Sequence, residues 1–576
     1  MIERVIPIRE LPADAEALRR RKRQQPKGRQ VEAGALAEVE AALGALPRRR
    51  DLLIEHLHAI HDAHGQLTTA HLAALARLLR LAQVEVYEVA SFYHHFDVVR
   101  EDENGDFPLP PRLTVRVCNG LSCELAGGGD LLRQLQAAVD SDADVRVVAA
   151  PCVGRCETAP VAVVHRNAIG SASVEAVASA IAAGAYAPAV APCVDLTAYR
   201  AGGGYRLLRD CLDGRRSVES VLETMESSGL RGLGGAGFPA GRKWRLVRAE
   251  PAPRLMAVNI DEGEPGTFKD SHYLERDPHR FIEGMRIAAW AVGIEAIYVY
   301  LRDEYHGCRA LLQRELERVQ ADPELAGGPR IELRRGAGAY ICGEESAMIE
   351  SIEGKRGMPR LRPPYVAQVG LFGRPTLEHN FETLHWVRDI LEQGPGWPTG
   401  TGRHGRHGLR SFSVSGRVAC PGVHRAPAGI TLRELVDEHC GGMQPGHTLY
   451  AYLPGGASGG ILPARLADVP LDFDTLQPHG AFIGSAAIIV LSEADRAVDA
   501  ARNLMRFFEY ESCGQCTPCR AGTAKASRLI ASDRWNTALL AELSQAMRDA
   551  SICGLGQAAP NPVDCVMRYF PHELIP

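Results

Sequence analysis

The segment Gly229-Leu-Arg-Gly-Leu-Gly-Gly-Ala-Gly-Phe-Pro239 is dense in glycine and includes the spacing G-x-G-x-x-G from Gly232 to Gly237. It follows a helical pattern at 218–227 rather than a strand, so it lacks the context of a dinucleotide-binding fingerprint. Its glycines still allow backbone N–H groups to approach a phosphate or a flat ring, and Arg242 and Lys243 add positive charge. The segment predicts a ligand-binding turn in an α/β domain.

An acidic turn follows this loop. The predicted strand Leu255–Asn259 runs into Asn259-Ile-Asp-Glu-Gly-Glu-Pro-Gly266. Carboxylates at the C-terminal edge of such a strand lie where α/β sheets bind ligands. Asp261, Glu262 and Glu264 are therefore suited to bind ribose or ribityl hydroxyls, or to position a carboxamide. The alternative is a solvated acidic turn, and the preceding glycine loop makes that alternative weaker.

A second glycine-rich turn, Gly336-Ala-Gly-Ala-Tyr-Ile-Cys-Gly-Glu-Glu345, repeats the arrangement. Tyr340 offers an aromatic face, and the two terminal glutamates offer acceptors. The sequence contains no Walker A or H-E-x-x-H motif, so ATP hydrolysis and metalloproteolysis have no support. Histidines at 56–64 and the pair His404 and His407 follow surface patterns, and we expect them not to be metal ligands.

The first cysteine group is Cys118-x4-Cys123 followed by Cys152-x3-Cys156. Each pair ends a predicted strand and enters a glycine-containing turn, so the four thiolates can converge. Thiolates suit iron–sulfur clusters or zinc, whereas structural zinc sites more often use C-x2–4-C pairs. The spacing alone favours a cluster over zinc, and zinc over inert cysteines.

The second cysteine group is the run Cys513-Gly-Gln-Cys-Thr-Pro-Cys519, which contains Cys516 at its centre. Its C-x2-C-x2-C spacing is typical of [4Fe–4S] binding. A fourth thiolate must come from Cys553 or Cys565. We choose Cys553, because the glycines beside it allow backbone N–H groups to approach the sulfurs. We expect no function for the remaining cysteines: Cys193, Cys211, Cys308, Cys342, Cys420, Cys440 and Cys565.

The 576 residues provide chain for about four domains at roughly 100–200 residues each. Alternating strands and helices at 113–181 indicate a compact α/β unit of thioredoxin size. Helical leucine spacing is typical of 51–96 and of the last 80 or so residues. Hydrophobic runs predict strands at 113–117, 145–149, 161–165, 255–259, 297–301, 411–416 and 488–491.

The composition limits the partner classes. Hydrophobic residues make up 45% and charged residues 23%, and 65 basic against 70 acidic side chains leave a net charge of −5. This balance gives no reason to expect nucleic acid or a membrane surface as a partner. The most apolar stretches, 174–194 and 480–491, are too interrupted or too short to span a bilayer. The N-terminus lacks the apolar core of a secretory signal, so we expect a cytoplasmic protein.

The combination of these motifs resembles a known family. From about Gly202, the chain resembles the NADH-binding flavoprotein subunit of respiratory complex I and its soluble relatives. Residues of about 35–185 resemble the small [2Fe–2S] subunit of that complex, here fused ahead of the flavin part. The whole chain most closely resembles β subunits of NAD-dependent formate dehydrogenases that contain molybdenum or tungsten, on stretches at 50–56, 253–259 and 547–553. The stretches that carry the flavoprotein resemblance are Gly232–Lys243, Asn259–Asp270, Gly336–Glu345, Thr376–Thr383 and Cys513–Cys519.

The resemblance implies a multidomain α/β and α fold. The expected parts are a basic arm (1–34), a helical domain (35–110), a thioredoxin-like [2Fe–2S] domain (111–186), a linker (187–201), a Rossmann-like FMN- and NAD-binding domain (202–405), a small ubiquitin-like α+β domain of SLBB type (406–492) and a helical [4Fe–4S] domain (493–576). The first cysteine group would hold [2Fe–2S].

The resemblance also implies roles for single residues. Phe238 would stack on the nicotinamide side, while Glu264, Glu345, Arg362 and Tyr365 would hold NAD(H). Where the family usually has two asparagines, this chain has His379-Asn380, and Leu233 replaces a common arginine. The implied FMN contacts are Gly232, Gly234, Gly235, Gly237, Lys243, Asn259, Asp261, Glu262, Tyr340, Gly343, Glu344, Asn380 and Thr383.

The implied activity is NADH:acceptor (diaphorase) chemistry, in which the flavin exchanges hydride with NAD(H) and single electrons with the clusters. No side chain is expected to act as a general acid or base; Glu264 and Glu345 would position the nicotinamide. The implied partner is a larger subunit with a molybdenum or tungsten pterin centre and further iron–sulfur clusters. The alternatives are the diaphorase subunit of a NAD-reducing hydrogenase, a fused complex I subunit, and a non-catalytic cluster scaffold.

Overall fold

The computed structural model describes residues 28–139, 144–396, 402–532 and 534–574. These residues form two compact units, one of 28–91 with 96–110, and one of 92–95 with the chain from Pro111 onward. Most of the predicted basic arm lies outside the described residues, and the first described helix begins at Ala33. Among the described residues, no helix is both long and apolar enough to cross a membrane.

The first unit is helical, with α2 (Ala33–Leu43), α3 (Leu53–His64), α4 (Thr69–Leu79) and α5 (Gln83–Phe92). Two short strands, β1 (Leu67–Thr68) and β2 (Val98–Val99), pair in parallel. Thr68 caps α4 by accepting a 3.0 Å hydrogen bond from the His71 N–H. The predicted surface position of two histidines is wrong: His56 and His58 are buried, because α3 is covered on more than one side.

The second unit begins with a four-stranded sheet in the order β4-β3-β5-β6. The strands β3 (Leu113–Cys118) and β4 (Val145–Ala150) are parallel, and β5 (Ala162–Val164) and β6 (Asn167–Ile169) form an antiparallel hairpin. Sequence reasoning missed β6, which is half exposed and carries no hydrophobic run. The helices α6 (Leu121–Leu125), α7 (Gly128–Val139) and α8 (Val174–Ala182) complete this part.

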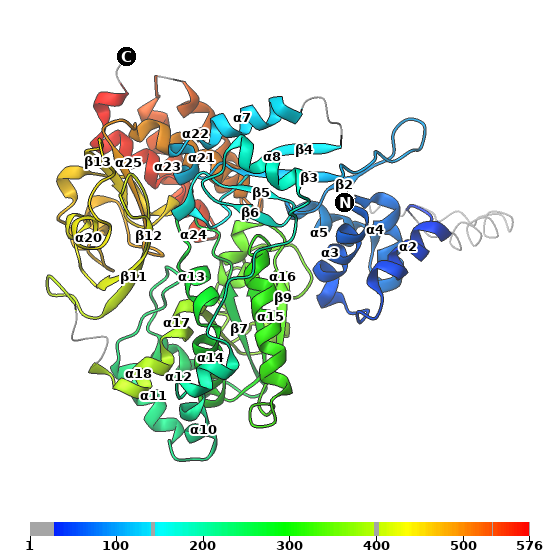
Figure 1. Ribbon diagram of the computed structural model, residues 1–576, viewed down its shortest axis with the longest axis horizontal. Helices are drawn as coiled ribbons and strands as arrows, with labels where there is room; N and C mark the ends of the chain where they lie inside the picture. Colours follow the sequence, from blue (N-terminus) through cyan, green and yellow to red (C-terminus); the bar gives the residue numbers. More distant parts are fainter. Residues whose placement is uncertain (1–27, 140–143, 397–401, 533, 575–576) are drawn as a thin grey trace, which may run out of the picture. The chain divides into compact units, whose positions relative to one another are not determined.

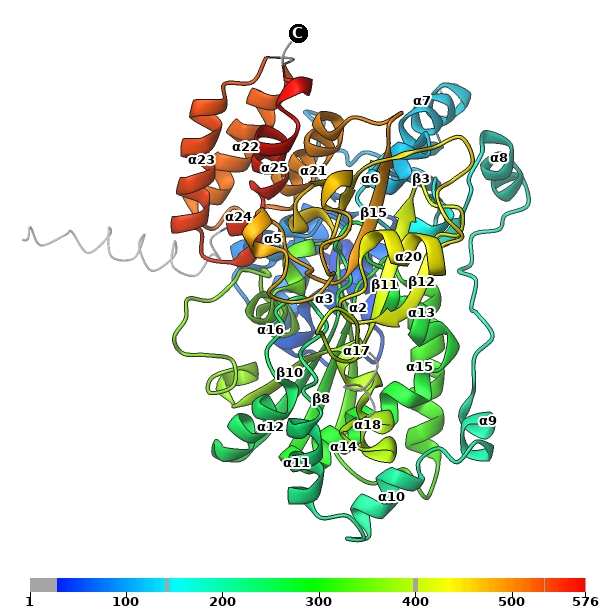
Figure 2. The same ribbon diagram turned by 90° about the vertical axis from the view of Figure 1, so that its left-hand side faces the viewer.

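A parallel sheet in the order β10-β7-β8-β9 forms the centre of the second unit. Its strands are β7 (Arg254–Ile260), β8 (Ile294–Leu301), β9 (Arg330–Arg335) and β10 (Thr376–Asn380). Figures 1 and 2 show helices around it, and the central strands β7 and β8 are buried almost throughout. A sheet buried on both faces needs near-continuous apolar strands. The helices are α10 (Arg206–Leu212), α11 (Val218–Ser227), α12 (Ala240–Ala249), α13 (Lys269–Arg276), α14 (Pro278–Val292), α15 (His306–Ala321), α16 (Glu345–Ile352), α17 (Phe381–His385) and α18 (Val387–Gln393).

The segment predicted as a linker, 187–201, contains structure of its own. It ends in α9 (Leu196–Ala201), whose Tyr199 is buried and donates a 2.6 Å hydrogen bond to Glu283 of α14. Upstream of α9, the Val194 N–H donates to the Arg276 carbonyl oxygen at 2.8 Å. The segment therefore packs along the parallel-sheet region.

The last two parts are a small mixed domain and a helical bundle. A five-stranded sheet in the order β12-β11-β15-β13-β14 packs against α20 (Leu432–His439). The bundle lies at the C-terminal end of the chain (Figure 2). The strands are β11 (Leu409–Gly416), β12 (Gly422–Pro427), β13 (Leu449–Leu453), β14 (Leu462–Pro463) and β15 (Ala487–Ser492); the bundle helices are α21 (Ala497–Glu511), α22 (Thr517–Ala531), α23 (Thr537–Ala550), α24 (Gly554–Ala558) and α25 (Asn561–Tyr569).

Candidate functional site

Four cysteines line one cavity in the helical bundle. Cys513 follows α21, Cys516 and Cys519 lie at the start of α22, and Cys553 precedes α24. All four line this cavity, together with Ile341 and Pro359 of the parallel-sheet region. Burial raises the pKa of Cys519 to about 11 and that of Cys553 to about 12, so a metal is needed to draw off their protons.

Cys565, the rejected fourth ligand, lies elsewhere. It is buried in α25, and its thiol faces the main-chain oxygen of Gly480 at 3.6 Å. It is not among the residues that line the four-cysteine cavity. Among the described cysteines of this region, the geometry therefore groups Cys553, and not Cys565, with the C-x2-C-x2-C run. Four convergent thiols are the donor set that a [4Fe–4S] cluster requires.

The first cysteine group also converges. Cys118 ends β3, Cys123 lies in α6, and Cys152 and Cys156 lie in the loop after β4. All four are buried, and the Cys152 and Cys156 sulfurs are 3.4 Å apart. Hydrogen bonds from Cys118 and Cys156 hold the pKa of Cys152 well below its usual value. This arrangement fits a cluster held by four thiolates.

The glycine loop is fixed at both of its ends. The Gly232 N–H donates to the Phe238 carbonyl oxygen at 2.8 Å, and the Leu233 N–H donates to the Thr383 hydroxyl at 2.9 Å. Gly237 has φ +67°, and an added Cβ there would lie 2.6 Å from the Phe473 ring. Glycine is therefore required at this position, both by the backbone conformation and by the close approach of the ring.

The acidic turn is buried rather than solvated. Glu262 accepts hydrogen bonds from the Asp270 N–H at 2.8 Å, the Ser271 N–H at 3.2 Å and the Tyr305 hydroxyl at 2.7 Å. Its side chain therefore caps the N-terminus of α13. This structural role was not part of the prediction that Glu262 contacts FMN. In the described part of the chain, the buried Oδ2 of Asp261 has no hydrogen-bond partner. An acceptor left in that state fits a ligand that brings a donor, such as a ribityl hydroxyl.

Glu264 and Tyr340 are joined directly. The Tyr340 hydroxyl donates to one oxygen of Glu264, and the other oxygen accepts from Ser458 through its N–H at 2.8 Å and its hydroxyl at 2.7 Å. On its main-chain side, the Tyr340 N–H donates to Glu511 at 2.9 Å. Burial raises the pKa of Glu264. Tyr340 thus lies between the acidic turn and the helix that leads into Cys513.

Charged residues gather at the C-terminal ends of β7 and β10. The Lys243 ammonium lies 3.2 Å from a Glu378 carboxylate oxygen and 4.0 Å from Glu345. Arg362 pairs with Glu344 and, at 2.9 Å, with Glu345. The sequence analysis did not predict Glu378. The one sign of its role in the sequence is that an acidic residue lies within a buried strand.

Two predicted residues, and one position where the chain departs from the family, lie differently from the rest. Phe238 and Tyr365, predicted to lie beside NAD(H), are 40% and 56% exposed, so both are free to meet a ligand at the surface. His379 is buried and accepts a 2.8 Å hydrogen bond from the Trp244 indole. Burial keeps the pKa of His379 well below its usual value. Its ring is therefore neutral and engaged with α12.

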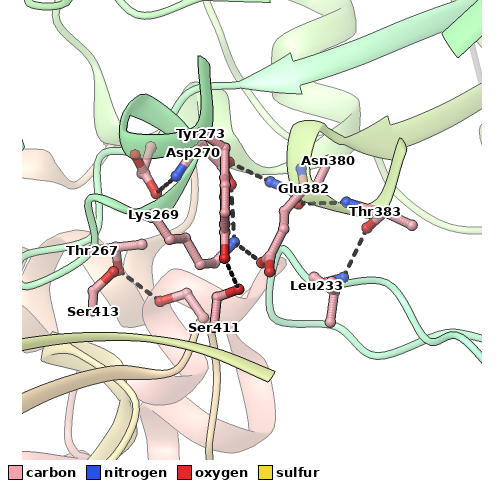
Figure 3. Close-up of polar contacts among 12 residues, drawn as sticks. Leu233, Thr267, Lys269, Asp270, Tyr273, Asn380, Glu382, Thr383, Ser411 and Ser413 are labelled. Atoms are coloured by element: carbon pink, nitrogen blue, oxygen red, sulfur yellow. Dashed lines mark hydrogen bonds and ion pairs between the residues drawn. The ribbon is translucent and has the colours of Figure 1, made fainter. Parts of the chain in front are cut away.

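A buried ion cluster connects these loops, as Figure 3 shows. The Lys269 ammonium lies 3.0 Å from Asp270 and 2.7 Å from Glu382. Asn380 donates to Asp270 at 2.6 Å and caps α17 by accepting from the Glu382 N–H at 3.0 Å. Thr383 in the same turn holds the glycine loop. Sequence reasoning missed this cluster, because its acid at 382 is distant from Lys269 in the chain.

Comparison with known families matches each part of this architecture. The descriptions of the matching family models are Nuo51 FMN-binding domain at residues 225–389, thioredoxin-like [2Fe–2S] ferredoxin at 39–185, SLBB domain at 411–462, and NADH-ubiquinone oxidoreductase-F iron-sulfur binding region at 499–575. These matches confirm the predicted fold class and the predicted cofactor set of FMN, NAD(H), [2Fe–2S] and [4Fe–4S].

Individual proteins are similar over long stretches. The mitochondrial NADH dehydrogenase [ubiquinone] flavoprotein 1 of Dictyostelium discoideum is 40% identical over 372 residues, which cover 62% of this chain and 78% of that protein. The mitochondrial NADH-ubiquinone oxidoreductase 51 kDa subunit of Neurospora crassa is 39% identical over 374 residues, or 62% of this chain and 76% of that protein. A crystal structure of NAD⁺-reducing [NiFe]-hydrogenase in the H2-reduced state contains a chain of 32% identity and TM-score 0.80, with 92% of each chain covered.

Proposed function

This chain belongs to the family of NADH-oxidising flavoprotein subunits that includes the 51 kDa subunit of NADH-ubiquinone oxidoreductase, and we propose that it is the electron-transfer (β) subunit of a cytoplasmic NAD-dependent formate dehydrogenase. It is an NAD(H)-dependent oxidoreductase subunit with an FMN-binding domain and two iron–sulfur regions. The proposal adds the partner, which is a larger subunit that oxidises formate at a molybdenum or tungsten pterin centre and holds further clusters.

One observation supports the electron-transfer role most strongly. Tyr340 contacts Glu264 of the acidic turn, and the next residue, Ile341, lines the four-cysteine cavity. The flavin domain and the [4Fe–4S] site therefore meet at adjacent residues. Bound FMN would supply hydride exchange with the nicotinamide and one-electron exchange with the clusters. The protein's own part is to hold the two sites close together and to exclude water between them.

In this proposal, the buried carboxylate of Asp261 and the glycine-loop N–H groups hold FMN, and Glu264 and Glu345 position the nicotinamide. Flavin extraction from the purified chain, followed by mass spectrometry, tests this part. FMN in about equal amount to protein supports it. Absence of flavin would leave only the cluster-scaffold alternative.

Two partner classes each have their own support, beside the alternative of a fused complex I subunit. Formate dehydrogenase is supported by the resemblance at 50–56, 253–259 and 547–553. The diaphorase subunit of a NAD-reducing hydrogenase is supported by the structural similarity over 92% of both chains. In either case, the chain alone should reduce ferricyanide with NADH, because the proposed FMN, NAD(H) and cluster sites all lie in it. Both cysteine groups serve electron transfer, and neither provides a site for a second substrate.

Co-purification with the native partner separates the two classes. Molybdenum or tungsten in the complex, together with formate-dependent NAD⁺ reduction that the isolated chain lacks, supports formate dehydrogenase. Nickel in the complex and hydrogen uptake would replace that assignment with hydrogenase. Formate oxidation by the isolated chain would contradict the division of labour between the two subunits.

A further inference from the structure

Glu378 is a buried acid among the residues predicted to form the flavin site. It lies near the end of β10 and is 9% exposed. The Lys243 ammonium donates to the Glu378 carboxylate at 3.2 Å and to its main-chain oxygen at 3.0 Å. The Asn259 side chain and the Glu345 carboxylate are also close enough to affect its pKa. Three predicted ligand-site residues therefore surround this one carboxylate.

Lys243 is the inner cation of this group. Its side chain is 22% exposed, whereas that of Arg362, which pairs with Glu344 and Glu345 nearer the surface, is 39% exposed. A charge at a desolvated site acts more strongly on its neighbours than a charge in water. Glu378 holds the ammonium through two hydrogen bonds and offsets its charge. Glu378 thus weakens the electric field that Lys243 exerts on a bound ligand.

The two members of this pair depend on each other. Burial raises the pKa of Glu378, and the positive charge of Lys243 opposes that rise. Without the ammonium, burial favours the protonated acid. Removal of Lys243 therefore leaves an acid that burial keeps protonated, whereas removal of the Glu378 charge leaves the Lys243 cation opposed only by Glu345, 4.0 Å away.

Given the proposed flavin function, we propose that Glu378 is a positioning residue that clamps Lys243 and lowers the affinity of the bound flavin for electrons. A reduced flavin is more negative than an oxidised flavin, so an uncompensated cation in its site favours reduction. With the cation offset, the flavin is a stronger reductant. A strongly reducing flavin suits delivery of hydride to NAD⁺.

The test is an equilibrium redox titration of the flavin in the full-length protein, with a reference dye and absorbance readout. Glu378→Gln keeps an acceptor for Lys243 and removes the negative charge. We expect about a tenfold rise in the equilibrium constant for two-electron reduction, which equals about 30 mV. In a Lys243→Met background, we expect the same substitution to cause little change. Glu315→Gln is the control. Glu315 is a buried carboxylate of α15 that pairs with His279 of α14 at 3.0 Å, and its loss should leave the flavin reduction potential unchanged.

The outcomes separate this inference from the proposed function. Wild-type protein without FMN would overturn the proposed function, and this inference with it. Wild-type protein with FMN, but with an unchanged potential in a flavin-loaded Glu378→Gln variant, would overturn this inference alone. An equal shift with and without Lys243 would also overturn it. Should Glu378→Gln not accumulate, Glu378→Leu is judged by the same criteria, and failure of both to fold would assign Glu378 a purely structural role.

Discussion

The Arg302 guanidinium donates a 2.7 Å hydrogen bond to the main-chain oxygen of Cys152. Arg302 is 4% exposed, and it also donates to the Glu262 carbonyl oxygen. A single buried side chain therefore ties the loop of the first cysteine group to the acidic turn. Phe268, which follows that turn, packs against Cys152 and Cys156.

We expect Arg302→Gln to loosen the [2Fe–2S] site. The shorter side chain leaves two buried carbonyl oxygens unsatisfied, at a cost of about 1–3 kcal/mol each. Thermal unfolding should begin earlier, and the EPR signal of the reduced [2Fe–2S] cluster should be lost during purification. Arg330→Gln is the control, because Arg330 is in an exposed ion pair that contributes little to the free energy of unfolding. Equal behaviour of the two variants would contradict the assignment.

The fourth ligand of the [4Fe–4S] cluster is tested with two cysteines. We expect Cys553→Ser to abolish or alter the EPR signal of this cluster, because the residue lines the four-cysteine cavity. Cys565→Ser should leave the signal intact, since this thiol faces Gly480 instead. A reversed pattern would transfer the ligand role to Cys565.

Two glycines with the same backbone conformation separate strain from steric contact. Gly229 has φ +65° with open space around it, whereas Gly237 has φ +67° and faces the Phe473 ring. Gly229→Ala should lower the free energy of unfolding by only about 1–2 kcal/mol, which is the cost of a left-handed backbone conformation for a residue with a Cβ. Gly237→Ala should add a clash, displace the loop and reduce the FMN content. Similar FMN content in both variants would show that the loop tolerates a side chain there.

Glu264→Gln tests the nicotinamide site. The substitution keeps the side-chain size but removes the charge that binds the Tyr340 hydroxyl and Ser458. We expect the kcat/KM of NADH:ferricyanide reduction to fall about tenfold or more, as for loss of a charged hydrogen bond. Flavin content should remain at the wild-type level. An unchanged rate would remove Glu264 from the nicotinamide site.

Glu262 should make stability depend on pH. Burial raises the pKa of Glu262 to about 8, above that of a glutamate in the unfolded chain. From about pH 5 to 8, the folded chain keeps a proton that the unfolded chain releases, so stability falls as pH rises. We expect Glu262→Gln to flatten this fall by up to about 1.4 kcal/mol per pH unit. Unfolding midpoints of both proteins across this range give the measurement, and parallel curves would contradict it.

The spacing of the cysteines could predict a [4Fe–4S] site and favour a second cluster, whereas FMN, NAD(H) and the [2Fe–2S] identity of that second cluster were implied by the family resemblance. The spacing of the run Cys513–Cys519 suits few metal centres other than a [4Fe–4S] cubane. The glycines beside Cys553 favoured this residue as the fourth ligand, and its thiol does line the cavity. Helix α11 has the predicted bounds, because its polar and apolar residues alternate with helical period. The individual flavin and nicotinamide contacts of the site residues are still predictions.

The ion pairs could not be predicted. Lys269 and Glu382 meet through the fold, and neither residue carries a local sign that it is buried. The edge strand β9 was also missed, because its sequence Arg-Ile-Glu-Leu-Arg-Arg is mostly charged. Such features arise from tertiary packing, which overrides local propensity.

The bond between Arg302 and Cys152 also has a consequence for biosynthesis. The four thiols of the first cysteine group have all been made once Cys156 is added, whereas Arg302 is added 150 residues after Cys152. At about 5–20 residues per second, translation leaves an interval of about 7–30 seconds between these events. During that time the thiols lack their contact with Arg302, and for most of it they also lack Phe268. The four thiols are thus at their most accessible while the chain is still being made.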